Sequence, residues 1–578
     1  MHHFFKHRFS ASYHFFDQVR NRPMRKRQTM RKRQATRKRQ TTRTIQEVTT
    51  FVTRSLALVL AIVVWGAGLG TEVQAADEEY DILIRDGRLL DGSGTPWTRA
   101  DVAIREGRIA AVGDLSNAAA EREIDAQGLY VTPGFIDTHS HAASGLQDEA
   151  LSAAEPLLAQ GITTAVLNPD GGGPIDLAEQ REALLENGLG VNAAQFVPHG
   201  SIRQEVIGMD DREATDEEQR EMRALVEKGM QEGAVGLSTG PFYEPGSFAP
   251  TEELVALAEV AADHGGLHQS HIRDESDYTI GVVHAVDELI EISRAADLPG
   301  VITHVKCLGP NVWGCSETIR HRVEQARAEG LEIFADQYPY PASATGLAAA
   351  LVPGWAMDGG REAFLERIAD DETREEVRED LLENLARRGG ADRIQFRRYE
   401  ENPSIEGEML GALAERRDMH PVDTALELLE AGSPGIVSFN MHERDVRSFM
   451  QQSWTMTASD GGLVEMGEGV PHPRNYGAFP RRIKQYVVEE EVTDLAQAIR
   501  SMTQMPATVY GLEERGMVRE GAIADVVVFD LDALNDPATF TEPHQLAEGM
   551  EYVFVNGTRV IDEGDFTGAR SGKVISAD

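Results

Sequence analysis

The middle of this chain alternates short apolar runs with amphipathic helical patterns, and few folds accommodate that alternation. Eight of the runs suit buried strands, and helical stretches such as TEELVALAEVAADHG separate them. Eight strand–helix repeats over about 370 residues fit an α/β fold of the (β/α)8 TIM barrel type with insertions, since such barrels usually take about 250 residues. The candidate strands are GFIDTHSH, TTAVLN, VNAAQFVPHG, VGLSTG, LHQSHIRDE, VITHVK, EIFADQYPY and WTMTASDGG.

Both ends of the globular part contain strand patterns joined by tight turns. Asp-Gly and Glu-Gly turns separate apolar runs near the start, and an Asn-Gly turn does so near the end. We therefore predict one small β-sandwich domain built from residues 77–131 and 511–578, attached to a metal-dependent barrel at 132–510. An acidic helical stretch in the largest gap between candidate strands predicts an insertion at about 341–450. This insertion is either a lid over the site or a surface decoration.

The first 76 residues have the composition of an export signal. A dense basic repeat at 24–41 precedes an apolar stretch at 56–69 and the small-residue motif Val-Gln-Ala at 73–75. The apolar stretch is shorter than the roughly 20 residues that span a bilayer, so we expect cleavage near Ala75 or Ala76. An uncleaved membrane anchor is the first alternative, and a nucleic-acid-binding arm is a weaker one. The sequence thus predicts an exported protein, periplasmic or extracellular, with no membrane attachment after cleavage.

The charge of the chain argues against nucleic acid as a partner. The formal net charge is −39, and residues 1–75 hold 15 Lys and Arg against 3 Asp and Glu. The remainder therefore carries −51, and a surface that acidic repels phosphate backbones. We expect a small-molecule substrate, and an oligomer is compatible with the sequence. The acidity also suggests a protein that stays soluble in high salt.

Histidines and one aspartate stand at the carboxyl ends of the candidate strands, where barrel enzymes hold their active sites. His139 and His141 end the first strand and share a face, because alternate strand residues point the same way. His271 and His304 end the fifth and sixth strands. Four imidazoles at one mouth are typical of a divalent metal site, above all for Zn²⁺. Asp460 ends the eighth strand, where a carboxylate can move protons to and from water, unless it only forms a turn.

Several longer motifs accompany these residues: PGFIDTHSH, GLSTGPFYEPGSFAPTEEL, SHIRDE, THVK, DQYPYPAS, HPRNYGAFPR, MPATVYGL and EGAIADVVVFD. Together they resemble the amidohydrolase superfamily and, within it, the N-acyl-D-amino-acid deacylases (D-aminoacylases), over roughly residues 79–575. The resemblance implies hydrolysis of the acyl amide bond of N-acyl-D-amino acids with one or two Zn²⁺ ions. His139 and His141 would hold one metal, His271 and His304 the other, and Asp460 would be the general acid/base and a ligand. Hydrolysis of a cyclic amide, ureide or D-dipeptide, and a non-catalytic metal-binding barrel, are the alternatives.

One position departs from that family. Its members usually carry a metal-ligating cysteine after the second strand, in a Gly-Asn-Cys-Gly turn. This chain has Asn168-Pro169-Asp170-Gly171 instead, which puts Asp170 where the thiolate would be. A carboxylate also ligates or bridges divalent metals but is a harder ligand than sulfur, so we expect Asp170 to bind metal rather than only to form a turn.

The resemblance also supports three residues for substrate binding. Lys306 shares a strand face with His304, Tyr338 ends the seventh strand, and Arg474 follows Asp460. Two cations and a phenol suit the α-carboxylate of an N-acyl amino acid. The alternative is that Lys306 and Arg474 pair with local carboxylates, such as Asp274 or Glu275.

Other candidates carry less weight. His199 and Arg203 follow the third strand and are weaker candidates for the site mouth, whereas His442 and His472 are not expected to bind metal. Cys307 and Cys315 flank the loop after the sixth strand and could form a disulfide in an oxidising compartment. We expect two thiols instead, because spacing alone does not establish disulfide geometry.

Overall fold

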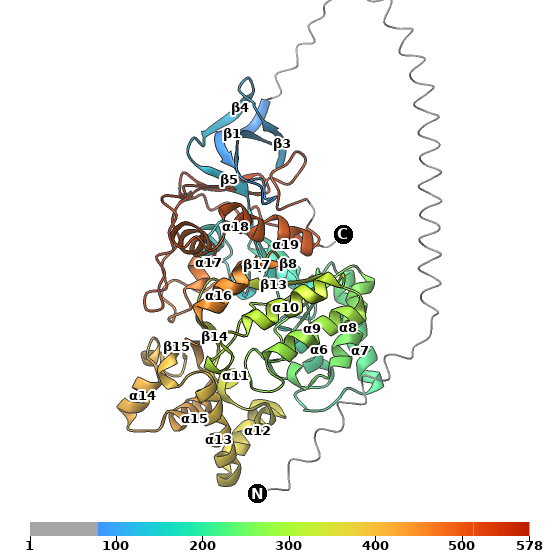
Figure 1. The fold of residues 1–578 in the computed structure, drawn as a ribbon, viewed down its shortest axis with the longest axis vertical. Coiled ribbons are helices and arrows are strands. Elements are labelled where there is room, and N and C mark those ends of the chain that lie inside the picture. Colours follow the sequence, from blue (N-terminus) through green and yellow to red (C-terminus); the bar gives the residue numbers. More distant parts are fainter. Residues whose placement is uncertain (1–78, 513, 577–578) are drawn as a thin grey trace, which may run out of the picture. The chain divides into compact units, whose positions relative to one another are not determined.

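The computed structural model describes residues 79–512 and 514–576 (Figure 1). The expected signal segment, residues 1–76, lies outside them. None of the helices in the described ranges is both long enough and apolar enough to cross a bilayer.

Strands from both ends of the described chain form one nine-stranded sheet. Along its path, β18 pairs antiparallel with β5, so the C-terminal strands continue the N-terminal ones. Ile84, Val102 and Val526 lie in one buried cluster, so the apolar faces of the two ends cover each other. The strands are β1 (Glu79–Leu89), β2 (Thr98–Arg105), β3 (Arg108–Gly113), β4 (Ala119–Asp125), β5 (Tyr130–Pro133), β18 (Val526–Phe529), β19 (Met550–Val555), β20 (Thr558–Asp562) and β21 (Asp565–Phe566).

Parallel strands occupy all eight predicted strand positions of the middle part. They are β6 (Phe135–Asp137), β7 (Ile162–Leu167), β8 (Asn192–Gln195) with β9 (Val197–Pro198), β10 (Gly236–Thr239), β11 (Leu267–Ser270), β12 (Gly300–Ile302), β13 (Ile333–Gln337) and β17 (Thr455–Thr457). They pair in chain order, but in two sheets: β6-β7-β8 and β9-β10-β11-β12-β13-β17. The α/β fold is as predicted, whereas a single closed strand ladder is not observed in the described residues.

The two sheets separate at the third predicted strand, which is divided at Phe196. Its first half, β8, pairs with β22 (Val574–Ile575) from the far end of the chain, and only β9 pairs with β10. On the other side, the sheets are joined just beyond β6 and β17. There, the Asp460 amide donates to the His139 carbonyl at 2.9 Å, and the His141 amide donates to the Gly461 carbonyl at 2.8 Å.

Helices connect the parallel strands, and α7, α8, α9 and α10 pack as successive neighbours (Figure 1). A capping box between Thr215 and Glu218 fixes the start of α7. The helices outside the insertion are α3 (Ala143–Gln147), α4 (Glu155–Leu158), α5 (Leu177–Glu186), α6 (His199–Val206), α7 (Asp216–Gln231), α8 (Thr251–Asp263), α9 (Val282–Ala296), α10 (Ser316–Ala328), α16 (Glu443–Met450), α17 (Arg474–Ile483), α18 (Leu495–Met502) and α19 (Gln504–Val509).

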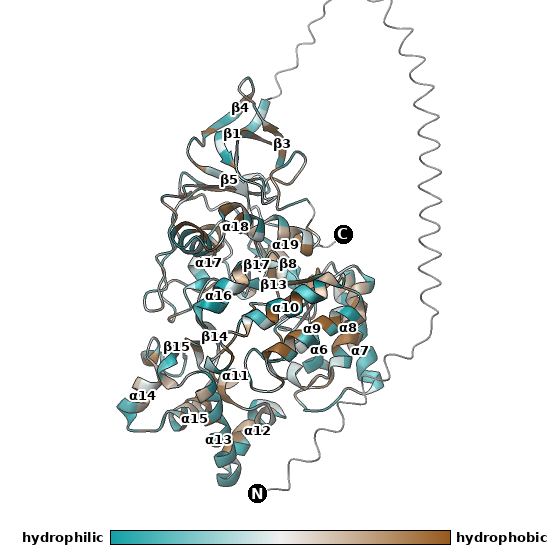
Figure 2. Cartoon of the chain, viewed as in Figure 1, coloured by the Kyte–Doolittle hydropathy of each residue, from teal (hydrophilic) through white to brown (hydrophobic). Residues whose placement is uncertain are grey.

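The insertion forms a subdomain with its own antiparallel sheet, β14-β16-β15. Its apolar residues make a separate core that includes Phe364, Leu381 and Ile436, while the acidic helix α13 is largely hydrophilic (Figure 2). The helix that follows β16, α16, packs on α10 and β13. Its elements are β14 (Ser343–Gly346), α11 (Leu347–Leu351), α12 (Gly360–Ala369), α13 (Asp371–Arg387), β15 (Ile394–Arg398), α14 (Leu410–Arg417), α15 (Pro421–Ala431) and β16 (Gly435–Ser438).

Candidate metal centre and active site

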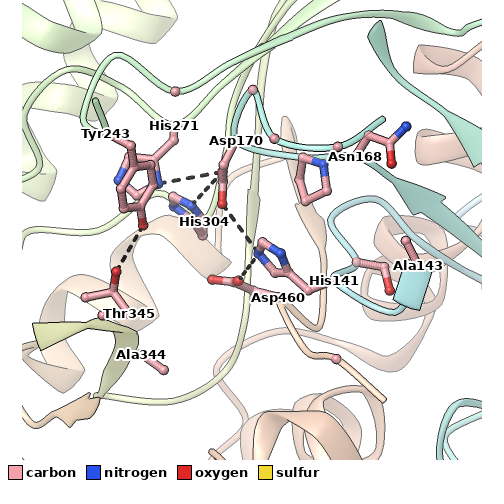
Figure 3. Close-up of a pocket in the computed structure, with 18 of the residues that line it drawn as sticks. His141, Ala143, Asn168, Asp170, Tyr243, His271, His304, Ala344, Thr345 and Asp460 are labelled. Carbon is pink, nitrogen blue, oxygen red and sulfur yellow. Dashed lines mark hydrogen bonds and ion pairs between the residues drawn. The ribbon is translucent and has the colours of Figure 1, made fainter. Parts of the chain in front are cut away.

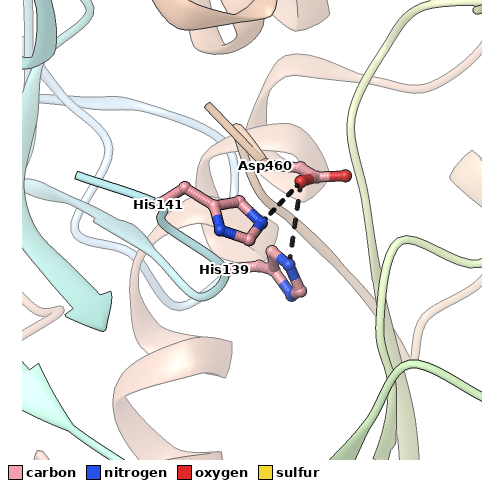
Figure 4. Close-up of side chains that lie close together, drawn as sticks. All are labelled: His139, His141 and Asp460. Carbon is pink, nitrogen blue, oxygen red and sulfur yellow. Dashed lines mark ion pairs between the residues drawn. The ribbon is translucent and has the colours of Figure 1, made fainter. Parts of the chain in front are cut away.

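The six predicted metal-site residues meet at the carboxyl ends of the parallel strands. Figure 3 labels five of them, and Figure 4 shows the sixth, His139. They are His139 and His141 after β6, Asp170 after β7, His271 after β11, His304 after β12 and Asp460 after β17. All except His139 line one pocket of about 830 Å³, and His139 lies buried beneath it. The insertion contributes to the same pocket through Ser343, Thr345 and Arg397. It is therefore part of the site wall and not only a surface decoration.

Asp170 lies between the two pairs of imidazoles. Its Oδ2 is 3.4 Å from Nε2 of both His139 and His141. Its Oδ1 is 3.6 Å from Nδ1 of His271 and 3.4 Å from Nε2 of His304. The backbone of Asp170 is left-handed (φ 57°), a conformation that aspartate tolerates better than most residues. The turn thus directs one carboxylate oxygen toward each pair, the arrangement of a bridging ligand.

Asp460 lies beside the His139–His141 pair (Figure 4). Its Oδ1 lies 3.2 Å from Nε2 of His141 and 3.7 Å from Nε2 of His139. Arg474 Nη2 donates to the same Oδ1 at 2.9 Å, and Nη1 lies 2.9 Å from Oδ2. Burial opposes ionisation of Asp460, but Arg474 and the imidazoles outweigh it and hold the pKa of the carboxyl well below its ordinary value. Asp460 is therefore an ionised carboxylate beside the cluster.

Glu275 is also a member of the cluster, although the sequence suggested it only as a pairing partner for Lys306 or Arg474. Its Oε2 lies 3.5 Å from Nε2 of His271, and its Oε1 lies 3.1 Å from Nδ1 of His304. Lys306 Nζ donates to the same Oε1 at 2.5 Å, so local pairing does occur for Lys306. The signal available in the sequence was the acidic residue four positions after His271, in SHIRDE.

The donor set fits a divalent metal. Three groups have their ligand atoms within 4.8 Å of one another: His139–His141–Asp460, His139–Asp170–His304 and His271–Glu275–His304. Both ring nitrogens of His139 and of His271, and Oδ1 of Asp170, are buried and make no hydrogen bond within the described residues. Buried polar atoms without partners are costly, and a cation held between them would satisfy them.

Charge balance within the cluster favours the same interpretation. Burial lowers the pKa of His141, but Asp170 and Asp460 raise it more, to about 9. Burial and Lys306 lower the pKa of His304, but Glu275 and Asp170 raise it more, to about 10. The carboxylates thus draw protons onto the imidazoles, and a metal ion would replace those protons as the source of positive charge.

Two buried aspartates hold the strand ends that carry the cluster. The Asp137 carboxylate accepts from the Ser459 amide at 2.8 Å and from its hydroxyl at 2.5 Å, which connects β6 to the end of β17. The Asp336 carboxylate accepts from the His304 amide at 2.5 Å, which connects β13 to the end of β12. These bonds position the backbone of His139, His304 and Asp460.

The predicted substrate residues line the pocket beside the cluster. Tyr338 is buried, and the Arg474 guanidinium lies 4.7 Å from the centre of its ring. Lys306 Nζ lies 5.8 Å from the same ring and 2.6 Å from Nδ1 of His304. Arg474 pairs with Asp460 itself rather than with Asp274. The three side chains therefore form one wall of the pocket.

Of the remaining candidates, His472 lines the pocket, whereas His199, Arg203 and His442 are not among its lining residues. His199 and Arg203 are on α6, are fully buried, and pair with Glu253 of α8: His199 Nε2 lies 3.0 Å from its carboxylate, and Arg203 donates to it. His472 accepts a hydrogen bond from the Arg474 amide at 3.0 Å, and His442 accepts one from the Arg444 amide at 3.1 Å. Cys307 and Cys315 are both free thiols, as expected.

We expect Glu253→Ala to lower the free energy of unfolding by about 3–5 kcal/mol, because it leaves the buried Arg203 guanidinium without its anion. Denaturant titration at constant metal concentration measures this loss. Glu259→Ala on the exposed side of α8 is the control and should change the value by less than about 0.5 kcal/mol. Equal effects of the two substitutions would contradict a structural role for the buried pair.

Comparisons with known proteins identify the family to which the chain is related. Residues 122–561 match the amidohydrolase family model. The N-acyl-D-glutamate deacylase of Alcaligenes xylosoxydans xylosoxydans is 35% identical over 527 residues, which cover 87% of this chain and 97% of that protein.

Two solved structures are similar over 86% of this chain and 100% of their own. One is a D-aminoacylase studied for its binuclear metal centre (32% identity, TM-score 0.74). The other is the N-acyl-D-glutamate deacylase of Bordetella bronchiseptica with zinc and a phosphonate that mimics the tetrahedral intermediate (33% identity, TM-score 0.73). The matched residues include every member of the cluster described above, and the chain belongs to the amidohydrolase family.

Proposed function

We propose that this protein is a metal-dependent hydrolase that cleaves the amide bond of N-acyl-D-amino acids and releases a carboxylate and a D-amino acid. The observation that carries the proposal is the Asp170 carboxylate between two imidazole pairs, with Asp460 beside one of them. Relatives that match over most of the chain act on linear amides of this kind.

His139, His141, Asp170, His271 and His304 would hold one or two divalent ions, with Asp460 beside them. When bound, such an ion supplies the Lewis acidity that makes water a nucleophile near neutral pH. We propose Zn²⁺, which suits imidazole and carboxylate ligands and is bound in one related structure.

Asp460 would move the protons of the reaction. Its Oδ1 takes a proton from the attacking water and later gives it to the departing amide nitrogen. Arg474 keeps this carboxylate ionised and fixes its orientation through both oxygens. After donating to Asp460, the guanidinium still has N–H groups for the substrate. Lys306 and Tyr338 complete the wall that would hold the α-carboxylate close to the scissile bond.

Finer features of the fold and of the cellular context are part of the proposal. We propose that the eight parallel strands are a (β/α)8 barrel whose ladder is interrupted at β8 and at β17, and that the boundaries near residues 131 and 511 separate it from the β-sandwich domain. The basic and apolar composition of residues 1–76 supports export to the periplasm or the cell exterior. Fractionation of cells expressing the full chain, with N-terminal sequencing of the product, tests export.

A substrate panel tests the reaction. We expect release of free amino acid from N-acetyl-D-amino acids, with L-enantiomers slower by roughly 100-fold or more, because a site that holds the α-carboxylate and the carbonyl fixes the third substituent of Cα. Chiral chromatography of the products measures both rates. Hydrolysis of only cyclic ureides or D-dipeptides, or no turnover by the metal-loaded protein, would contradict the proposal.

A further inference from the structure

Five Lys and Arg side chains line the pocket, and four of them already have partners. Arg388 is fully buried and donates to the Ala350 carbonyl at 3.1 Å. Each of the other three is paired with a carboxylate: Lys306 with Glu275 at 2.5 Å, Arg474 with Asp460 at 2.9 Å, and Arg398 with Glu400 at 2.9 Å and Glu468 at 3.0 Å.

Arg397, on β15 of the insertion, is the fifth. Its half-buried side chain makes no hydrogen bond or ion pair with any described residue, and its Nε is buried without a partner. Its backbone carbonyl accepts from the Val470 amide at 2.7 Å, which holds this part of β15 against the loop that follows β17. The backbone therefore fixes the position of Arg397 in the pocket wall, while its guanidinium forms no ion pair within the described part of the chain.

The charges around Arg397 call for an anion. Burial and the nearby Arg474 guanidinium lower the pKa of Arg397, and the Asp460 carboxylate, which forms no ion pair with it, opposes them only in part. Glu244 also lines the pocket, but burial raises the pKa of its carboxyl, and no ion pair joins it to Arg397 in the described part of the chain. A guanidinium binds a carboxylate through two parallel N–H groups, so a carboxylate is the ligand best matched to this position.

Under the proposed function, the α-carboxylate of the substrate binds to residues other than Arg397. Its carbon is two bonds from the scissile nitrogen, so it must lie close to the cluster. Lys306 and Arg474 meet that condition, because they contact His304 and Asp460 directly. Arg397 makes no such contact and comes from the inserted subdomain, so it suits a group farther from the reacting bond.

We propose that Arg397 binds a second carboxylate of the substrate, and that the preferred substrates are N-acyl-D-amino acids with an additional acid group. That group is either on the amino-acid side chain, as in N-acetyl-D-glutamate, or at the end of the acyl chain, as in an N-succinyl amino acid. The proposal rests on the proposed deacylase function and narrows its substrate class.

The test compares matched substrates in the metal-loaded full-length protein. N-acetyl-D-glutamate is paired with neutral N-acetyl-D-glutamine, and N-succinyl-D-norleucine with N-butyryl-D-norleucine. We expect Arg397→Gln to lower kcat/KM about 10- to 100-fold for the dicarboxylate of one pair and less than about threefold for its neutral partner. The pair that responds shows which half of the substrate carries the second carboxylate.

Arg398→Gln is the matched control, because it removes the same charge from the adjacent residue of β15, whose side chain pairs with Glu468. It should leave the ratio of charged to neutral substrate within about twofold of the native ratio. Arg397→Lys should recover part of the preference, since it keeps the charge but not the two-pronged geometry. An equal loss on all four substrates, or no loss, would overturn the proposal.

The native protein provides a second measurement that does not depend on the folding of a variant. It should prefer the dicarboxylate of the responding pair by about tenfold or more, and the preference should weaken as salt screens the charge. Hydrolysis of all four substrates by the native protein without such a preference would contradict only the assignment of Arg397 to a second carboxylate. If the native protein hydrolyses no N-acyl-D-amino acid, that result contradicts the proposed function itself.

Discussion

Asp460→Asn should lower kcat by about 10²- to 10⁴-fold while the protein keeps its bound metal. The amide has nearly the same shape as the carboxylate but cannot take a proton from water. Five of the six predicted ligand residues remain, so the metal content should stay close to the native value. Steady-state kinetics on the best substrate of the panel, together with elemental analysis of the dialysed protein, measures both quantities.

Glu468→Gln is a suitable control for this substitution. It also neutralises a carboxylate that lines the pocket, but that carboxylate pairs with Arg398 at the rim and not with the cluster. Its kcat should stay within a few-fold of the native value. Native turnover by Asp460→Asn would mean that another group moves the proton and that Asp460 only forms the turn after β17.

Asp170→Asn should remove most of the bound metal and, with it, nearly all of the activity. Asparagine tolerates the left-handed backbone at this position, so the turn is preserved, but the negative charge facing both imidazole pairs is lost. Metal affinity should fall at least about 100-fold, measured by competition with a chromophoric chelator. The unfolding midpoint in excess chelator should change little, since the turn itself is intact.

Asp170→Cys provides the complementary experiment. Family members usually carry a cysteine at this position, and a thiolate is also an anionic ligand. We expect the variant to bind zinc again, with a preference shifted from harder ions such as Mn²⁺ toward softer ones. Full metal content in Asp170→Asn would contradict a ligand role, whatever the behaviour of the cysteine variant.

Local sequence patterns were enough to predict that the four histidines and Asp460 lie at one end of the fold, but they did not identify Glu275 as a donor. Each histidine follows an apolar run that forms a strand, and parallel strands in one α/β fold bring their carboxyl ends to the same side. That geometry is a property of the fold class, so His139 and His304 could be assigned to one site although they lie far apart in the chain. Asp170 was identified because the family motif marked its position.

The position of His199 could not be predicted from its place after a strand. It follows the third strand, as the predicted ligands follow theirs, but α6 begins at this residue and its side chain meets Glu253 of α8. The strand itself is divided because β8 pairs with residues 574 and 575, almost 400 positions away. Neither pairing leaves a local signal in the sequence.

The fold class, the type of chemistry and most of the cluster residues could be inferred before folding is considered, because strand periodicity and donor type are encoded over a few neighbouring positions. The pairing of charges is visible only in the folded chain: Glu275 joins the cluster, Arg474 pairs with Asp460, and Arg397 forms no ion pair within the described ranges. Ion pairing depends on distances of a few ångströms between segments that only the folded chain brings together.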